Sequence, residues 1–266
     1  METLQRSAVR TEAGGEPLPP AFKVFQQNNI VFRRSELSMI AGAPGAGKSS
    51  LALAIAVKLA VPTLYFSADT NSRTMAMRTL AMTNGITQVQ AEYMLNAQKD
   101  VSSQALANVS HIFWSFDSTP TLKDIDEEVA AFETQWGTSP TMIVIDNLMD
   151  IAMDGYEEFG GMRQAMKELK YLARNTNAAV LILHHTQEGV AGNPCQPRSA
   201  IQGKVSQVPA MVLTTGQEQM GDDNYLCIAP VKNRYGRASK SGDYYMRLSF
   251  HPESMQIGDV AGYEVS

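Results

Sequence analysis

The sequence predicts an α/β fold: a mostly parallel β-sheet with helices on both faces and an antiparallel extension at its C-terminal end. Three observations predict it. From about residue 22 to residue 205, strand-like and helix-like stretches alternate, which is typical of a parallel sheet covered on both faces. An apolar strand, a glycine loop and a helix follow one another over residues 37–57. After residue 205 only loops separate the strand-like stretches, which favours antiparallel pairing.

The 266 residues carry a formal net charge of -5, with 44% hydrophobic and 18% charged residues. This is an ordinary globular composition. Residues 1–21 contain a Gly- and Pro-rich stretch and no apolar periodicity, so we predict a flexible arm there and a single domain over 22–266.

Several classes of protein are excluded by the same survey. No apolar run approaches ~20 residues and the first ten residues lack an apolar signal segment, so we expect no membrane association and no secretion. The two cysteines, Cys195 and Cys227, lack metal-site spacing. We therefore expect a reduced, cytoplasmic setting. An acidic pI of 5.4 argues against general attraction to nucleic acid and leaves room for a local basic strip.

The elements follow in order along the chain. Short apolar runs predict buried strands over 37–41, 62–67, 111–116, 142–146 and 179–183. Helices are predicted over 50–57, 71–84, 120 to about 136, and 162–174. In the third of these helices, Thr121 and Asp124 form a capping-box variant, and the apolar residues from Leu122 to Trp136 recur at a 3-4-3-4 spacing. Later strands are expected over 208–214, 225–231 and 244–250.

Residues 42–49 read Gly-Ala-Pro-Gly-Ala-Gly-Lys-Ser, which is a complete phosphate-binding loop between a strand and a helix. The glycines allow consecutive backbone N–H groups to face a phosphate chain, and the helix directs its positive end there. Lys48 supplies a charge and Ser49 a hydroxyl for Mg²⁺. We therefore expect ATP and Mg²⁺ as cofactors. The predicted nucleotide-binding residues are Gly42, Ala43, Pro44, Gly45, Ala46, Gly47, Lys48, Ser49 and Ser50.

Polar residues at three strand ends complete the predicted site. Asp146 closes a buried strand, where it is a candidate Mg²⁺ ligand beside Ser49 or else a helix cap. Asp69 is the candidate for positioning water, next to the phosphate-loop strand if sequential strands adjoin, or else an N-cap. His184 and His185 close the fifth strand, where a histidine can donate to the γ-phosphate or serve a structural role.

Several segments together resemble one family, the RecA-like motor domain of DnaB-type replicative helicases. The resemblance covers about residues 30–258, and its most specific part is the late K-x-R-x-G element followed by F-x-P-E. The His184–Thr186 segment looks more like the related plasmid replication helicases. The matching segments are residues 40–49, 65–69, 143–148, 181–186, 232–236 and 250–253.

The resemblance implies a role for each matching residue. Lys48 and Ser49 would bind phosphates and Mg²⁺, with Asp146 as the second Mg²⁺ group. Asp69 stands where the family usually has a glutamate that activates water, and it is one methylene shorter. His185 stands at the γ-phosphate sensor, where these helicases commonly have glutamine. Lys232 and Arg234 resemble basic fingers that reach a neighbour's nucleotide, which implies a ring-shaped homo-oligomer, a hexamer by analogy.

Two loops correspond to the family's single-strand-binding loops. The first covers about 153–161, with Gly155, Gly160 and Gly161. The second covers 187–203, with Gly192 and, as predicted nucleic-acid contacts, Arg198, Gly203 and the following Lys204. Each is alternatively an ordinary surface loop.

Three functions follow from these residues. The first is an ATP-driven motor on single-stranded or forked DNA, a helicase in replication or recombination, working with other replication proteins in a bacterial or phage-infected cell. The second is a RecA-like accessory ATPase, a loader or recombination mediator that does not unwind. The third is a metal-dependent, structure-specific DNA nuclease built from Asp69, Asp146, Asp150, His184 and His185.

Overall fold

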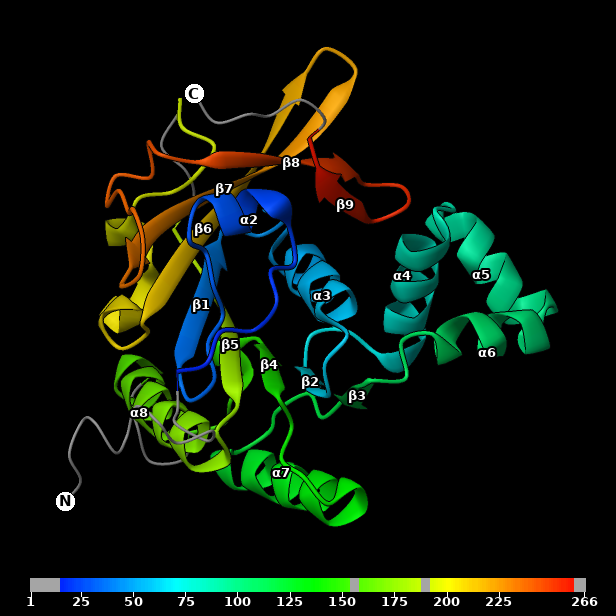
Figure 1. Cartoon of the computed structure of the whole chain (residues 1–266), viewed down its shortest axis with the longest axis horizontal. Helices are drawn as coiled ribbons and strands as arrows, with labels where there is room; N and C mark the ends of the chain where they lie inside the picture. The colour runs from blue at the N-terminus through cyan, green and yellow to red at the C-terminus, as the bar shows by residue number, and fades with distance from the viewer. Residues whose placement is uncertain (1–14, 154–157, 188–191, 261–266) are drawn as a thin grey trace.

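The computed structural model describes residues 15–153, 158–187 and 192–260. In this part of the chain one sheet of nine strands forms the centre, in the order β3-β2-β4-β5-β1-β6-β7-β8-β9 (Figure 1). The strands are β1 Leu37–Gly42, β2 Thr63–Ser67, β3 Ile112–Ser115, β4 Met142–Asp146, β5 Ala179–His185, β6 Met211–Met220, β7 Asp223–Asn233, β8 Met246–His251 and β9 Gln256–Asp259.

The strand register confirms a mostly parallel sheet with an antiparallel C-terminal part. Strands β3, β2, β4, β5, β1 and β6 pair in parallel, and β7, β8 and β9 continue in antiparallel fashion. The predicted antiparallel start at 208–214 is wrong, because β6 runs parallel to β1, with Ser38 opposite Met211. The chain crosses back between β5 and β6, so β6 begins at the same edge of the sheet as β1. Strand β9 was not predicted.

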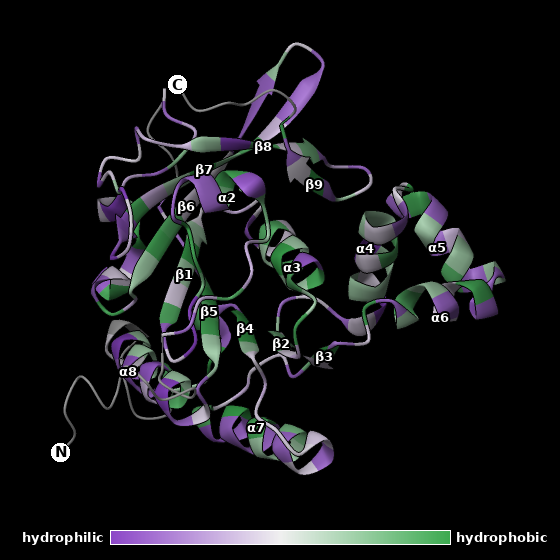
Figure 2. Ribbon diagram, viewed as in Figure 1, coloured by the Kyte–Doolittle hydropathy of each residue, from purple (hydrophilic) through white to green (hydrophobic). Residues whose placement is uncertain are grey.

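The helices cover both faces of this sheet. They are α2 Lys23–Gln27, α3 Lys48–Leu59, α4 Ser72–Asn84, α5 Gln88–Ala97, α6 Lys99–Ala107, α7 Leu122–Trp136 and α8 Glu158–Thr176, with short 3₁₀ turns η1 Leu148–Asp150, η2 Arg198–Ala200 and η3 Gln202–Gln207. Residues of α2 and α3 share one core cluster with one side of the strands, and residues of α7 and α8 share another with the opposite side. The central strands are largely hydrophobic, whereas α7 and α8 mix hydrophobic and hydrophilic residues (Figure 2). This is the pattern expected of buried strands and half-covered helices.

The start of α7 confirms the predicted capping box. The Thr121 side chain accepts from the Asp124 N–H, and the Asp124 carboxylate accepts from the Thr121 N–H at 2.8 Å. Along the predicted stripe, Ile125, Val129 and Phe132 are buried. Trp136, the last residue of that stripe, is 49% exposed, so the buried stripe ends one turn early.

Helices α5 and α6 were not predicted. With α4 they form a group at the β3 edge of the sheet (Figure 1). Their small core consists of Leu80, Ala81 and Ala91, with further apolar side chains packed around it. Of the ten residues of α5 only Ala91 is buried, so this helix has no apolar stripe that its sequence could reveal.

The predicted flexible arm is wrong for residues 15–21. The Gly15 N–H donates to Arg34 O and the Leu18 N–H to Phe32 O, both at 2.8 Å, and the Leu18 side chain is buried. One apolar side chain and a short run of backbone hydrogen bonds thus attach this segment to the domain. Residues 1–14 lie outside the described part of the chain. Among the described helices, none combines the length and apolarity needed to cross a bilayer.

Candidate active site and neighbouring basic loops

The phosphate-binding loop joins β1 to α3, as the motif predicts, and α3 begins at Lys48. Gly47 precedes the helix with a φ of 83°, and a Cβ there would lie 2.6 Å from a methyl carbon of Leu226 in β7. Both the positive φ and the close approach favour glycine at this position. The unpaired N–H groups in the first turn of α3 therefore face the loop, where they can bind an anion.

Lys48 places its charge at the base of this loop. Its ammonium group donates to the carbonyl oxygens of Gly42 and Ala43, each at 3.0 Å, and the side chain is buried. Burial lowers the pKa of Lys48, while the nearby carboxylates of Asp146 and Asp69 act in the opposite direction. An ammonium group bonded in this way is positioned to serve phosphate oxygens bound in the same loop.

A hollow of about 270 Å³ opens beside the loop. The predicted residues that line it are Gly45, Gly47, Lys48, Ser49 and Ser50. Pro44 is exposed, and the Ala46 N–H donates to Ala43 O at 3.1 Å, so these residues shape the loop itself. The lining also includes residues that were not predicted: Arg78, Gln88, Gln217 and Met255. They come from segments far apart in the sequence, and no local motif marks them.

Asp146 ends β4 and is 6% exposed. Burial raises the pKa of its carboxyl to about 6, and a hydrogen bond from the Ser49 hydroxyl works against this rise. The alternative role as a helix cap is wrong, because the neighbouring Asn147 caps η1 by accepting from the Met149 N–H at 2.9 Å. A carboxylate and a hydroxyl in contact are oxygen donors of the kind that Mg²⁺ prefers, so Asp146 and Ser49 fit this ion.

Asp69 follows β2, and its predicted position beside the phosphate-loop strand is wrong. Strand β1 lies between β5 and β6, and both β4 and β5 separate it from β2. The carboxylate nevertheless lies close enough to act electrostatically on Lys48, Asp146 and His185. The carboxyl ends of parallel strands meet at one edge, which explains this proximity. Asp69 is not the N-cap of α4, since Asn71 accepts from the Thr74 N–H at 2.9 Å.

The two histidines at the end of β5 serve different sides of the sheet. His185 lies opposite Gly42 in the register, is half-buried, and has its pKa lowered by burial and by Lys48. His184 is fully buried, and its Nε2 lies 3.1 Å from the carbonyl oxygen of Gln202. Burial lowers the pKa of His184 to about 4, so its ring is neutral and Nε2 donates this bond. Neighbouring residues thus reach the phosphate loop and the second predicted DNA loop.

The residues considered for a nuclease do not form a metal site. Within the described ranges, no group of three or more His, Cys, Asp or Glu side chains is placed to hold a metal ion. His184 bonds to Gln202, and Asp150 accepts from the Asn147 N–H at 3.2 Å. The arrangement therefore gives the nuclease hypothesis no support.

Lys232, near the end of β7, is held within its own chain. Its ammonium group donates to the carbonyl oxygens of Ser206 at 3.3 Å and Gln207 at 2.7 Å, and also to that of Pro209. Burial lowers the pKa of Lys232 to about 8, and the positive charges of Arg198, Arg234 and Lys170 add to this. Arg234 itself is exposed, just beyond the strand. Of the two predicted fingers, Arg234 is exposed and Lys232 is half-buried.

The second predicted DNA loop ends in a basic hollow of about 510 Å³. Arg198 is half-buried and donates to the Oγ and the carbonyl oxygen of Ser206, both at 3.2 Å. Gly203 and Lys204 have φ values of 67° and 56°, which turn the chain sharply. Arg198, Lys204 and Lys240 all line this hollow. Lys240 comes from a loop that is distant in the sequence, and it was not among the residues predicted to contact DNA.

The first predicted DNA loop is shorter than expected. Gly160 and Gly161 lie within the first turns of α8, which begins at Glu158. Gly155 lies outside the described residues. A helical start at this point leaves residues 151–157 between η1 and α8.

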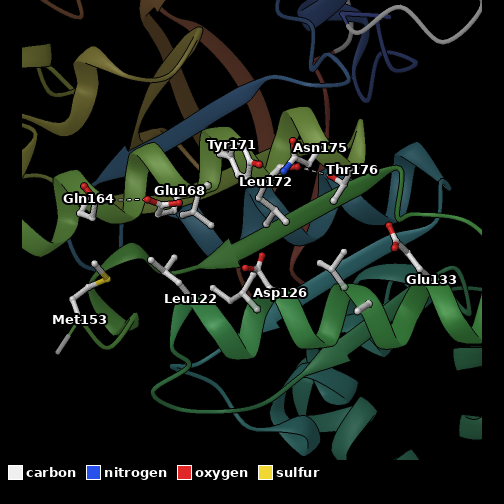
Figure 3. A pocket seen from close by; sticks show the side chains of 14 residues that line it. Leu122, Asp126, Glu133, Met153, Gln164, Glu168, Tyr171, Leu172, Asn175 and Thr176 are labelled. Atoms are coloured by element: carbon white, nitrogen blue, oxygen red, sulfur yellow. Dashed lines mark hydrogen bonds between the residues drawn. The ribbon is translucent and has the colours of Figure 1, made fainter.

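A larger hollow of about 610 Å³ lies between α7 and α8 (Figure 3). Its rim carries Asp126, Glu133 and Glu168, and its lining contains none of the predicted site residues. Burial and the charge of Glu168 raise the pKa of Asp126. This acidic rim disfavours phosphate, so size alone does not identify the nucleotide site.

Comparisons with known proteins agree with this geometry. Residues 1–190 match the protein family described as "AAA domain". The Gene 65 protein of Mycobacterium phage L5 is 32% identical over 266 residues, which span 97% of this chain and 99% of that protein. A replicative DNA helicase DnaB of Nostoc is 26% identical over 184 residues, 65% of this chain but 21% of the helicase. A solved DnaB-like replicative helicase has a TM-score of 0.79 at 16% identity, over 91% of this chain and 62% of that one. The chain therefore belongs to the AAA-domain family, as a P-loop ATPase with the RecA-like motor fold of DnaB-type helicases.

Proposed function

We propose that the protein is an ATP-driven motor that moves along single-stranded DNA, a replicative-type helicase acting in replication or recombination. One observation carries the proposal: adjacent residues of β5 serve both sites. His185 lies beside the phosphate loop, and His184 donates to Gln202 in the basic loop. A change in the phosphates bound beside His185 can therefore be transmitted through β5 to the basic loop that contains Gln202. The DnaB name of a relative at 26% identity supports the same reading.

Each residue of the nucleotide site has a proposed role. Lys48 and the loop N–H groups bind the phosphates, and Asp69 orients the attacking water. Ser49 and Asp146 would hold Mg²⁺, which neutralises phosphate charge when bound. Burial lowers the pKa of His185, which favours the neutral ring, and its proposed role is to donate a hydrogen bond to the γ-phosphate.

The exposed Arg234 is the proposed finger for the nucleotide of an adjoining copy. A finger supplied in trans requires a head-to-tail interface, and such an interface forms a ring when its rotation closes. We propose a ring-shaped homo-oligomer, a hexamer by analogy, around single-stranded or forked DNA. Lys232 would have to leave its three carbonyl partners to act in the same way, so its trans role stays a prediction. The proposed setting is the cytoplasm of a bacterial or phage-infected cell.

A mixing experiment tests the trans arrangement. Lys48→Ala and Arg234→Ala should each lose nearly all ATP hydrolysis, and only the first should lose nucleotide binding. In a one-to-one mixture, roughly a quarter of the interfaces would pair an intact loop with an intact finger, and hydrolysis should partly return. Arg237→Ala is the matched control, because Arg237 stacks on Tyr244 of its own chain, 4.0 Å from the ring centroid. A mixture that stays inactive would contradict a shared site.

Strand displacement on a forked substrate separates the motor from an accessory ATPase. The proposed helicase hydrolyses ATP faster with single-stranded DNA and displaces the paired strand. DNA-stimulated hydrolysis without displacement would identify a loader or recombination mediator instead. Hydrolysis that ignores DNA altogether would overturn both readings.

A further inference from the structure

Arg78 lies in the hollow beside the phosphate loop, although no motif marks it. It comes from α4, whose N-terminus is capped by Asn71. The same hollow is lined by Lys48, Ser49 and Ser50 from the first turn of α3. Arg78 is half-buried, so its guanidinium group is partly removed from water.

The described residues offer this guanidinium group no partner. Over residues 15–153, 158–187 and 192–260, no hydrogen bond or ion pair of Arg78 is found, although its charge acts on the Tyr65 hydroxyl. By contrast, Arg73 on the same helix donates to Asn96. The described lining of the hollow also contains Lys48 and no Asp or Glu. Two cations and a helix N-terminus, with no carboxylate in the described lining, suit the binding of an anion.

The wall that carries Arg78 is held in place. Three residues of α4 that are near Arg78 in the sequence are buried: Met75, Thr79 and Leu80. The helix that follows is attached to the β8–β9 turn, where the Gln88 N–H donates to Glu253 O at 2.8 Å. The Gln88 side chain also donates to Pro252 O at 3.2 Å. Arg78 therefore projects from a fixed support, which limits the entropy lost when it binds a ligand.

The residues proposed for hydrolysis are not part of the lining of this hollow. The charges of Asp69 and His185 are coupled to that of Lys48, but neither residue lines the hollow of Arg78. The hollow instead extends along α3 to Ser50. We propose that Arg78 binds an inner phosphate, α or β, of the nucleotide on its own chain. Its planar guanidinium suits phosphate oxygens, and its effect is on nucleotide affinity rather than on the chemical step.

This inference rests on the proposed nucleotide site, and the experiment separates the two. Calorimetric titration of the full chain with ATP and with ADP, each with Mg²⁺, should show both affinities reduced about 10- to 100-fold in Arg78→Ala, by the same factor. Arg78→Lys should restore part of the loss. The rate at saturating ATP should stay within about threefold of the parent, because the lost contact is made equally before and during reaction. Arg73→Ala, five residues away on the same helix, should change neither affinity.

Each other outcome has a distinct meaning. Unchanged affinities in both Arg78 variants would overturn the inference. A loss confined to ATP would place Arg78 at the γ-phosphate and overturn the inner-phosphate assignment. Full ATP affinity in Lys48→Ala would overturn the nucleotide site itself. Arg78→Lys keeps the charge and most of the apolar stem, so it remains informative if thermal unfolding shows that Arg78→Ala is poorly folded.

Discussion

Lys48 and Lys232 have the same bonding but opposite surroundings. Both ammonium groups donate to backbone carbonyl oxygens, and burial lowers the pKa of each. Lys48 faces the carboxylates of Asp146 and Asp69, whereas Lys232 faces Arg198 and other cations. The phosphate loop is thus prepared for an anion together with a metal cation. The region of Lys232 has an excess of positive charge, which suits phosphates from DNA or a neighbouring copy.

The two regions also differ in how the backbone supports them. The phosphate loop follows a strand that is paired on both sides, with β5 and β6 as neighbours. The basic region consists of 3₁₀ turns, with Lys204 at a φ of 56°. The backbone pairing around the phosphate loop therefore holds it in one geometry. The basic region depends on side-chain bonds, such as those of Arg198 and Lys232 to Ser206, which can be exchanged for other acceptors.

The largest expected effect is that of Asp146→Asn. Hydrolysis should fall about 10³-fold, because the charged group proposed to hold Mg²⁺ is lost. The folded-state pKa of about 6 lies above the ordinary 3.8, so the folded protein favours the proton, and this contribution to stability is lost as pH rises through 6. The free energy of unfolding measured with urea should therefore be about 1–3 kcal/mol higher in the variant than in the parent at pH 7, with little difference at pH 4.

Asp126→Asn is the control for this change. Asp126 also has its pKa raised by burial, but it lies in the hollow between α7 and α8. The Asp126→Asn substitution should leave the rate of ATP hydrolysis unaltered. If Asp146→Asn were less stable than the parent at pH 7, the carboxylate would be better satisfied than the structure indicates.

The second comparison uses the paired histidines. His185→Ala should lower hydrolysis about 10- to 100-fold without DNA, since it removes the proposed donor to the γ-phosphate. His184→Ala should leave that basal rate within a few-fold and instead reduce the stimulation by single-stranded DNA, because it removes the bond to Gln202. Both rates follow from phosphate release with and without DNA. Equal effects of the two variants would argue against the division between the faces of the sheet.

The third comparison tests whether the basic hollow lined by Arg198, Lys204 and Lys240 binds DNA. Lys204→Ala and Lys240→Ala should each weaken binding to single-stranded DNA by about three- to tenfold, across sequences. Each should also reduce the slope of log affinity against log salt by about 0.7. Fluorescence anisotropy at several salt concentrations measures both. Lys123→Ala removes an exposed lysine that pairs with Glu127 on α7, and it should have no effect.

The smallest expected effect concerns pH. A pKa of about 8 means that Lys232 loses its charge in the folded protein between pH 7 and 9, so DNA affinity should decline by about two- to threefold over that range. Lys232→Arg should remove this decline, since arginine stays charged. Because the folded pKa lies below 10.5, stability should rise between pH 8 and 10.5. A parent protein whose DNA affinity does not change with pH would show that the charge of Lys232 does not contribute to DNA binding.

The local parts of the site could be predicted because their residues are contiguous. The loop from Gly42 to Ser49 carries its own strand and helix, and Asp146 ends an apolar run that is recognisable as a buried strand. The sequence placed Asp69 at the correct edge of the sheet, the one with the carboxyl ends of the strands, although the strand order assumed for this was wrong. The assignment survived because the carboxyl ends of all the parallel strands meet there.

Residues contributed from a distance could not be predicted in the same way. Arg78 has the local context of an ordinary helical residue, and only the packing of α4 near α3 places it in the nucleotide hollow. Lys240 joins Arg198 and Lys204 through a loop more than thirty residues away in the sequence. The attachment of residues 15–21 also depends on a partner segment, 32–34, that has no signal of its own.

By itself, the sequence determined the fold class and the phosphate loop, because periodicity and glycine placement act through neighbouring residues along the chain. Only the tertiary structure decided which side chains share a hollow, which lysine is held by carbonyls and which arginine is left exposed. Charges and hydrogen bonds act through space, so their balance at Lys48 and at Lys232 is set by residues that the chain order does not bring together.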